Sequence, residues 1–588
     1  MSALLPPPGA SDRTTPHVKG RAAMSRGGSA NGYASPTAGD TPGNTAGHLA
    51  ARAGALVRGL TERPWGEVTA SVYETGRLVT LAPWLTGHAE RVAFLTGAQR
   101  PDGSWGVHDD YALVPTLSAT EALLADLRRG RTAGGATGGG PPTTTLDGEH
   151  GTPAAAAGRG LRALLRWSRG GYPGPRPDMP AVELIVPYLV EAMNGHLEAL
   201  RAAGLAPSAL IDGAASLSLP SGMRTDKLAG VRSALRAGAV LPDKLMHALE
   251  VAGDAAAGAR GVPITPAGTV GASPAATAAW LGAGRAPEPG HPARVHLEAV
   301  ARLHGGPVPC GMPITVFERG WVVSWLLRAG VPVAMPARVL RSLNEGLGPQ
   351  GISAGAGLPG DADTTSVALY ALALAGAPGE PSSLWGYRAG THFATWQGEQ
   401  GFSTTTNAHV LDCFREYATG RPDASPRYAA AVAEVAGWLL ERQAADGSWS
   451  DRWHASPYYA TMCCAVALDA AGGGRVERDR VRRAVRWVLS GQRADGAWGL
   501  WRGTAEETAY AMQTLLLCES AREEPGRDRA VASGHAYLLR AGEDEPCTPM
   551  WHDKDLYTPL AVVRAAIIGA LHLAGRDATV APHLKSAH

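Results

Sequence analysis

The chain has 588 residues and a formal net charge of +1, so its composition gives no general electrostatic attraction to nucleic acid or to anionic membranes. No apolar stretch reaches the length that spans a bilayer, and the six cysteines show neither CxxC spacing nor a metal-finger pattern. We therefore expect a cytoplasmic, helix-rich protein with reduced cysteines, no integral membrane segment and no nucleic-acid partner.

The N-terminal residues 1–60 are rich in Ala, Gly, Pro, Ser and Thr and contain almost no aromatic residue. Such a composition buries too little apolar surface to offset the entropy that is lost on ordering, and it predicts a disordered tail. A bias toward Gly, Pro and Thr in residues 131–156 predicts a flexible insertion between two helices. The remaining length suits two or more domains.

Three short segments of similar sequence recur along the chain: AQRPDGSWG at 98–106, RQAADGSWS at 442–450 and GQRADGAWG at 491–499. In each, a Gln precedes a Trp by six residues, and an Asp-Gly turn signal lies between them. An apolar helical pattern follows each segment, and VRRAVRWV at 481–488 has apolar residues at the spacing of one helical face. Repetition of such helix pairs predicts a bundle or a closed ring, in which Gln holds a helix end and Trp covers a turn.

A longer Gly-rich turn precedes the helix that we expect over 367–376, and it carries two carboxylates in GDADTTSV at 360–367. Asp363 or Thr364 can cap this helix by accepting hydrogen bonds from its first free amides. Alternatively, Asp361 and Asp363 face a cavity, because a helix N-terminus in a ring of helices points toward the mouth or the centre of the ring. These residues alone leave both interpretations open.

Several segments in this order resemble the class II terpene cyclases, relatives of squalene-hopene cyclase and of copalyl diphosphate synthases, over about residues 64–575. The resemblance rests on the Gln-x3-Gly-x-Trp repeats and the Asp-x-Asp-Thr-Thr motif, and on SVYETGR at 71–77, LPDKLMHALE at 241–250, GASPAATAAWLG at 271–282, PITVFERGWVVSWLLRAG at 313–330, TTTNAHVLDCF at 404–414 and WHDKDLYTPLAVVRAAIIGAL at 551–571.

The resemblance implies an all-α fold of two double-layered α/α barrel domains, the β and γ domains of the family, without a class I α domain. We expect the γ-like domain in segments over 61–330, with the chain crossing from the other domain. We expect the β-like domain, which carries the acid motif, over 331–588.

The resemblance also implies an enzyme that starts cyclisation by protonating an alkene of a prenyl chain. Carried over to this motif, Asp363 is the general acid, Asp361 tunes or orients it, and Thr364 supplies a hydroxyl group. Thr364 stands where the commoner family motif has a third Asp. His247 falls where plant relatives place a histidine linked to the terminating deprotonation.

Substrate binding is likewise assigned from the resemblance, although each residue type is more often an ordinary surface charge or a core aromatic. Cations are expected to bind the diphosphate, Trp side chains to stabilise carbocations along the cavity wall, and a carboxylate to help hold Mg²⁺. The residues are Lys554, Lys244 and Arg77 for the diphosphate, Trp280, Trp321 and Trp325 for the cavity wall, and Glu74 for Mg²⁺.

Neither a DDxxD string nor an Asn-Ser-Glu type metal triad is present, so the diphosphate is expected to stay on the product. The predicted activity is cyclisation of geranylgeranyl diphosphate to a bicyclic copalyl- or labdane-type diphosphate. A separate class I synthase or phosphatase is then expected to act downstream. The alternative within this class is cyclisation of farnesyl diphosphate to a drimenyl-type diphosphate.

A non-catalytic helical toroid scaffold is the alternative from another class. Glycoside hydrolases and protein prenyltransferases also use such helical folds, but the residues of this chain fit neither chemistry. Glycoside hydrolysis needs carboxylates about 5–9.5 Å apart across the scissile bond, and Asp361 and Asp363 lie on one turn. Protein prenyl transfer needs a zinc site, and the adjacent Cys463 and Cys464 are unsuited to hold one tetrahedral metal.

Overall fold

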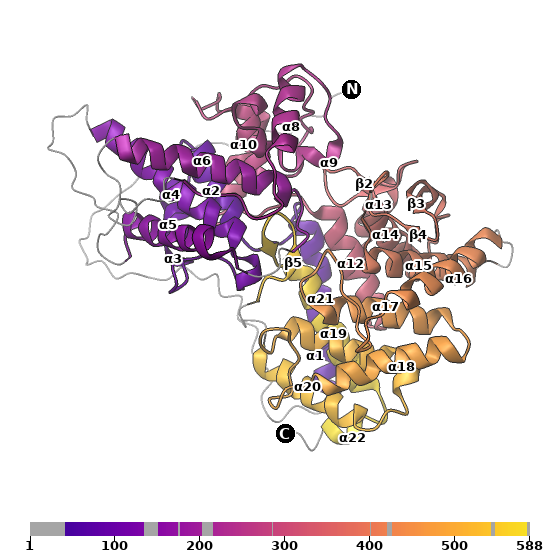
Figure 1. The fold of residues 1–588 in the computed structure, drawn as a ribbon. Coiled ribbons are helices and arrows are strands. Elements are labelled where there is room, and N and C mark those ends of the chain that lie inside the picture. Colours follow the sequence, from indigo (N-terminus) through magenta and orange to yellow (C-terminus); the bar gives the residue numbers. More distant parts are fainter. Residues whose placement is uncertain are drawn as a thin grey trace, which may run out of the picture. The chain divides into compact units, whose positions relative to one another are not determined.

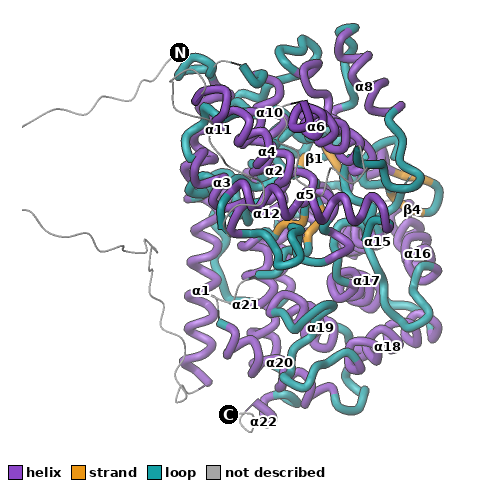
Figure 2. Tube along the Cα trace, turned by 60° about the vertical axis from the view of Figure 1, so that its left-hand side comes forward, coloured by secondary structure: helices purple, strands orange, loops and turns teal. Residues whose placement is uncertain are grey.

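The computed structural model describes residues 42–134, 151–173, 177–202, 216–284, 286–399, 401–419, 421, 426–542 and 547–584. The chain divides into two compact units, and all of the described residues lie in the unit 40–588. Helices dominate these ranges, and the strands form short antiparallel hairpins (Figure 2). No helix of the described part is both long and apolar enough to cross a membrane.

The C-terminal part is a ring of helices in two layers (Figure 1). Each inner helix packs on the next and the last packs on the first, in the order α12 (Thr315–Arg328), α14 (Ala362–Leu374), α15 (Thr404–Thr419), α17 (Pro457–Ala471), α19 (Ala505–Leu517) and α21 (Leu560–Arg576). The outer layer consists of α13 (Ala337–Glu345), α16 (Pro426–Glu441), α18 (Arg475–Ser490), α20 (Arg527–Ala541), α22 (Ala581–Leu584) and α1 (Pro42–Glu62).

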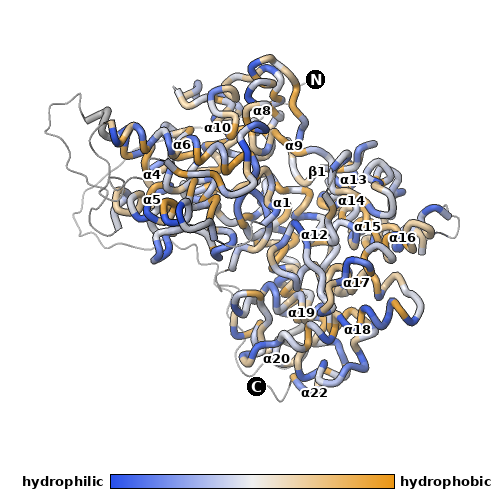
Figure 3. Tube along the Cα trace, viewed as in Figure 1, coloured by the Kyte–Doolittle hydropathy of each residue, from blue (hydrophilic) through white to orange (hydrophobic). Residues whose placement is uncertain are grey.

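The sequences of the two layers explain this arrangement. Inner helices such as α14 are apolar on nearly every side and lie within one continuous core. Outer helices are amphipathic: α18 buries Val481, Ala484, Val485 and Val488, which confirms the predicted helical face, and Figure 3 shows hydrophilic residues along the same helix.

The N-terminal part repeats this plan on a smaller scale. Its inner elements also close on themselves, in the order α2 (Val72–Leu81), α4 (Leu113–Gly134), α6 (Val182–Ala202), the 3-10 helix η2 (Leu249–Ala256) and α10 (Pro274–Leu281). The remaining helices of its described residues are α3 (His88–Gly97), η1 (Asp109–Tyr111), α5 (Pro153–Gly170), α8 (Asp226–Arg236), α9 (Asp243–Met246) and α11 (Pro292–Leu303). The predicted all-α fold of two double-layered rings is therefore confirmed.

The three repeated Gln–Trp segments have the structural role that their sequence predicts. The Gln443 amide donates to the carbonyls of Gly447 at 2.8 Å and of Arg480 at 2.9 Å, so it links its own turn to the next outer helix. The Trp449 indole donates to the Leu439 carbonyl at 2.8 Å. The same pattern recurs around Gln99 and Gln492.

Three predicted boundaries need correction. Residues 42–60 are not part of a disordered tail, because they form helix α1, whose apolar face packs on α12 and α21. The insertion predicted over 131–156 is shorter, since α4 continues to Gly134 and α5 begins at Pro153. The division predicted at 330 lies earlier, because α12 belongs to the C-terminal core. Residues 1–41 and 135–150 lie outside the described residues.

Short hairpins and 3-10 helices connect the helices of the C-terminal ring. They are β1 (Ile352–Ser353) with β2 (Gly360–Asp361), η3 (Ser382–Tyr387), β3 (Arg388–Ala389) with β4 (His392–Phe393), η4 (Glu519–Ala521), and β5 (Trp551–His552) with β6 (Leu556–Tyr557). The turn of the last hairpin contacts the N-terminal ring: Asp555 Oδ2 accepts hydrogen bonds from Tyr73 N at 3.2 Å and Ser71 Oγ at 3.1 Å.

Candidate active site

A cavity lies where the first turn of α14, the start of α12, the β5–β6 hairpin and the end of α9 meet. Its wall is mostly aromatic and apolar and includes Phe317, Trp321, Trp396, Trp453, Tyr459 and Trp551. Asp361, Asp363 and Thr364 of the acid motif line the same cavity. A low-polarity cavity with a few converging polar groups is the expected form of a small-molecule site.

The acid motif is held by local backbone structure. Asp361 pairs with Ile352 in the β1–β2 hairpin and is the N-cap of α14, where its Oδ1 accepts the Thr364 amide at 2.6 Å. Thr365 Oγ1 donates to the Asp361 carbonyl at 2.5 Å and accepts the Ile352 amide at 2.9 Å. The prediction that Asp363 or Thr364 caps the helix was therefore wrong: Asp361 does so, and the side chain of Asp363 is left for the cavity.

Asp363 is paired with His409, a residue of α15 that no motif in the sequence indicates as a site residue. His409 Nδ1 lies 2.7 Å from Asp363 Oδ1, and both side chains are largely buried. Burial opposes the charge of His409, but the Asp363 carboxylate, with help from Cys463, raises its pKa to about 10. The imidazole is therefore cationic near neutral pH and donates Nδ1–H to the carboxyl group.

Asp361 has a different electrostatic environment. Burial raises its pKa to about 7, the hydrogen bonds from Thr364 oppose this change, and the charge of Asp363 adds to it. The two carboxyl groups therefore differ, as acid–base pairs commonly do: one sits beside a cation and the other is desolvated. Asp363 is the one of the two that has a cationic hydrogen-bond donor beside it.

Only one of the three tryptophans predicted to line the cavity does so. Trp321 faces it, and its indole donates to Tyr459 Oη at 3.1 Å. Trp325 instead packs in the ring core against Tyr510, and Trp280 packs in the N-terminal core beside His291. Both predictions were wrong, because aromatic residues at helical spacing look alike whether they face a cavity or a core.

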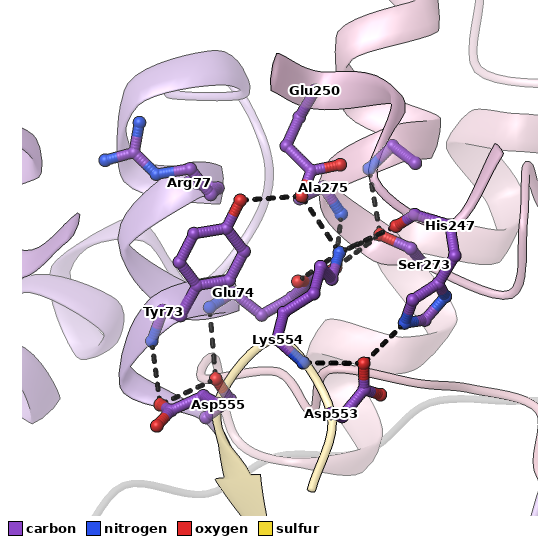
Figure 4. A network of polar contacts seen from close by, with 12 residues as sticks. Tyr73, Glu74, Arg77, His247, Glu250, Ser273, Ala275, Asp553, Lys554 and Asp555 are labelled. Atoms are coloured by element: carbon purple, nitrogen blue, oxygen red, sulfur yellow. Dashed lines mark hydrogen bonds and ion pairs between the residues drawn. The ribbon is translucent and has the colours of Figure 1, made fainter. Parts of the chain in front are cut away.

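Lys554 lies in a buried polar network between the two rings rather than at the cavity (Figure 4). Its Nζ lies 2.8 Å from Glu74 Oε2 and 3.0 Å from Glu250 Oε1, and it donates to Ser273 Oγ at 2.8 Å and to the His247 carbonyl at 2.9 Å. The side chain is fully buried, and burial, which lowers its pKa, is outweighed by the two carboxylates, which raise it. The prediction that Lys554 binds diphosphate was therefore wrong.

Glu74 is occupied by the same network. Its Oε1 accepts from Ser273 Oγ at 2.6 Å and from Ala275 N at 2.8 Å, and its Oε2 faces Lys554. Burial raises the pKa of Glu74 to about 7 against the effect of Lys554. Among the described residues, no group of three or more His, Cys, Asp or Glu side chains could hold a metal ion. The residues therefore do not fit the predicted Mg²⁺ ligand role of Glu74.

The two remaining cations predicted to bind diphosphate have opposite environments. Arg77 is fully buried, pairs with Glu121 at 2.5 Å and donates to Ser118 Oγ at 3.0 Å, so its predicted role was wrong. Lys244 is exposed and lines the cavity, and within the described part of the chain no partner engages its ammonium group. Lys244 is thus the predicted cation whose position suits an anionic ligand.

His247 lines the cavity and is held on both sides of its ring. Nδ1 lies 2.6 Å from the Gly271 carbonyl and Nε2 lies 2.7 Å from Asp553 Oδ1. Burial lowers the pKa of His247, but the charge of Asp553 outweighs this effect and raises it. Asp553 lines the cavity as well.

Comparisons with known proteins agree with this geometry. The squalene-hopene cyclase C-terminal domain family matches residues 402–558. The chain is 42% identical over 525 residues to the ent-copalyl diphosphate synthase of Streptomyces sp. (strain KO-3988), covering 89% of this chain and 95% of that protein. It is 39% identical over 528 residues to the copalyl diphosphate synthase of Streptomyces cyslabdanicus, and this match covers 89% of this chain and 95% of that protein.

A solved structure gives the same result. The ent-copalyl diphosphate synthase from Streptomyces platensis matches with a TM-score of 0.81 and 43% identity, covering 90% of this chain and 99% of that one. The scaffold alternative is thereby set aside. With its two helical rings and its Asp-x-Asp-Thr-Thr motif in an aromatic cavity, the chain belongs to the class II diterpene cyclases, enzymes related to squalene-hopene cyclase.

Proposed function

We propose that this enzyme converts geranylgeranyl diphosphate into a bicyclic copalyl-type diphosphate and leaves the diphosphate in place. The observation that carries the proposal is Asp363, which faces an aromatic cavity while a cationic His409 holds one of its two oxygens. The names of the relatives support the same substrate class, since both are copalyl diphosphate synthases.

The first chemical step follows from this geometry. In the active form Oδ2 of Asp363 carries the proton, because Oδ1 accepts from His409. The terminal alkene of the substrate takes this proton as its π electrons form the new C–H bond, and the adjacent carbon becomes a cation. The next two double bonds then attack in turn and close two rings. His409 donates a hydrogen bond to the carboxylate that Asp363 becomes and so stabilises the negative charge that develops there during proton transfer.

The cavity wall suits the cation that follows. Trp321, Trp396, Trp453 and Trp551 offer aromatic faces, which stabilise a cation without forming a bond to it. The apolar surroundings also limit water, whose attack would end the reaction early. The diphosphate is proposed to lie near Lys244, the exposed ammonium group at the cavity.

Mg²⁺ is proposed to arrive with the diphosphate rather than to occupy a protein-only site. Mg²⁺ usually keeps several waters and binds through phosphate oxygens and one or two carboxylates. We also propose that a separate class I synthase or phosphatase consumes the product, and that the enzyme acts in the cytoplasm. Fractionation of the source cells tests the location.

The proposed function is tested by incubating the purified protein with geranylgeranyl and farnesyl diphosphates in separate reactions. Products are dephosphorylated and identified by mass spectrometry. We expect a bicyclic alcohol from the twenty-carbon substrate, and we expect Asp363→Asn to abolish it. Asp412→Asn, which changes another buried carboxylate of the same ring that does not line the cavity, is the matched control. A product from the fifteen-carbon substrate alone would overturn the substrate assignment.

A further inference from the structure

The reaction must also end, and the structure restricts which group can accept the final proton. His247 is unsuited to this task, because both of its ring nitrogens are occupied. The Gly271 carbonyl can only accept, so Nδ1 must carry a hydrogen, and Nε2 faces the Asp553 carboxylate. An ion pair with Asp553 requires a hydrogen on Nε2 as well. The cationic ring then has no lone pair with which to remove a proton.

His552, the other histidine of the cavity, is occupied in a different way. Its Nδ1 lies 2.7 Å from the Arg452 carbonyl and must donate to it, so Nε2 accepts the Tyr111 hydroxyl at 3.0 Å. Burial lowers the pKa of His552 to about 4, so the ring is neutral. Its one lone pair is therefore already engaged.

Asp553 differs from both histidines, because one of its oxygens is free. Oδ1 accepts from His247 Nε2 at 2.7 Å and from the Lys554 amide at 2.7 Å. Figure 4 shows the second oxygen without any dashed contact, and among the described residues Oδ2 has no hydrogen-bond partner. Asp553 lines the same cavity as Asp363, but it comes from the β5–β6 hairpin, whereas Asp363 lies at the start of α14.

Asp553, Asp363 and Tyr557 line the same cavity, Asp553 and Tyr557 from the β5–β6 hairpin and Asp363 from the start of α14. Burial raises the pKa of the Tyr557 hydroxyl, and the charges of both Asp553 and Asp363 add to the effect. Asp553 and Asp363 have separate partners, because His247 holds Oδ1 of Asp553 and His409 holds Oδ1 of Asp363. An acid and a base at different points of the wall suit a cation that migrates between the first and the last step.

We propose that Asp553 is the base that ends the cyclisation, with His247 and Lys554 as the residues that position it. This inference rests on the proposed function. In the terminating step a C–H bond beside the cation breaks, its electron pair forms the new C=C bond, and the proton moves to Asp553 Oδ2. Asp363 has supplied one proton and Asp553 has received one, so substrate and product are isomers.

The buried network explains how the free carboxylate stays ionised and fixed. Burial would raise the pKa of Asp553, but the charges of His247 and Lys554 outweigh burial and lower it. A weakly basic carboxylate suffices here, because a C–H bond next to a carbocation is an extremely strong acid. Lys554 is in turn held by Glu74 and Glu250, so the hairpin that carries Asp553 is attached to the N-terminal ring.

The test compares the products that three variants make from geranylgeranyl diphosphate. Asp553→Asn keeps one oxygen for His247 but replaces the free carboxylate oxygen with an amide. Asp555→Asn is the matched control, because it changes another buried carboxylate of the same turn. The oxygens of Asp555 accept hydrogen bonds from Ser71, Tyr73 and Leu556, and Asp555 does not line the cavity. His247→Gln removes the imidazole but keeps a donor for Asp553. Circular dichroism verifies that each variant is folded.

We expect Asp553→Asn to shift most of the product to a bicyclic diphosphate that carries a hydroxyl group from captured water, or to an isomer with a different double bond. Asp555→Asn and His247→Gln should keep the wild-type product, with a lower rate for His247→Gln. The proposal is overturned if folded Asp553→Asn gives the wild-type product alone or no product, or if His247→Gln changes the product. Failure of the wild type to cyclise would instead overturn the proposed function.

Discussion

Replacing His409 tests the electrostatic basis of the acid. The pKa of His409 rises from an ordinary 6.5 to about 10, chiefly because of Asp363. This difference corresponds to about 5 kcal/mol of interaction between the two charged groups. The same hydrogen bond, 2.7 Å from His409 Nδ1 to Asp363 Oδ1, holds the conjugate base that Asp363 becomes when it gives up its proton. If about half of this energy is expressed when the proton is partly transferred, His409→Gln slows protonation on the order of 50-fold.

The assay is the turnover rate at saturating geranylgeranyl diphosphate. His296→Gln is the matched control, since it removes a buried imidazole of the N-terminal ring that is far from the acid motif in sequence and does not line the cavity. We expect the control to keep most of its activity and His409→Gln to retain a few per cent with an unchanged product. A His409→Gln rate within about threefold of the wild type would refute the electrostatic argument.

The remaining predictions concern stability and binding. The pKa of Asp361 is about 7 in the folded protein and an ordinary 3.8 in the unfolded chain. Between about pH 4 and pH 7 the folded protein therefore binds a proton that the unfolded chain has already released. The free energy of unfolding consequently falls as the pH rises through this range. Asp361→Asn keeps the helix cap but has no carboxyl group to titrate, so its stability should not fall over this pH range. Above pH 7 we expect it to be about 2–4 kcal/mol more stable than the wild type, measured by thermal unfolding at a series of pH values. Lys554→Met should cost about 3–5 kcal/mol in denaturant unfolding, because it leaves two buried carboxylates unpaired. Lys244→Ala should instead raise KM with unchanged stability, which steady-state kinetics will measure. Gln443→Ala loses two hydrogen bonds to carbonyls and should lower the free energy of unfolding by about 1–3 kcal/mol, whereas an unchanged value would contradict the linking role.

The fold could be predicted from the sequence because it repeats one local unit. The Gln–Trp segments contain their own hydrogen-bond partners, such as the Gly447 carbonyl four residues after Gln443, so each can be interpreted without long-range information. The acid motif is equally local: Asp361 ends strand β2 and caps α14, and Asp363 lies in the first turn of that helix. Helix α1 was not predicted because its Ala- and Gly-rich composition resembles that of a disordered tail, whereas Leu49, Ala53 and Leu56 are buried in the core of the C-terminal ring.

The site residues that were assigned wrongly depend on contacts between distant segments. Lys554 meets Glu250 across 304 positions of sequence, and nothing in the residues around Lys554 indicates that it is buried. His409 lies 46 positions from Asp363 on a helix of otherwise ordinary composition. Its signal was present in the TTTNAHVLDCF segment, where a histidine occurs on an apolar helix that must pack beside the acid motif.

Asp553 shows the same limitation for the terminating step. The sequence drew attention to Lys554 and His247 by residue type and by resemblance, but the free carboxylate oxygen lies on the residue between His552 and Lys554. Which oxygen is bound and which is free follows from three-dimensional hydrogen bonding alone.

The central claim, that Asp363 starts the reaction by giving a proton to the prenyl chain, is tested most directly in heavy water. Wild-type enzyme is equilibrated in D₂O and supplied with geranylgeranyl diphosphate, and the intact diphosphate product is analysed by mass spectrometry and NMR. We expect one deuterium at the ring methylene carbon next to the carbon that bears two methyl groups, because protonation of the CH carbon of the terminal alkene places the cation on the dimethyl carbon. The diphosphate should still be attached, and Asp363→Asn should give no product. A cyclised product without deuterium, or release of inorganic diphosphate, would contradict the account.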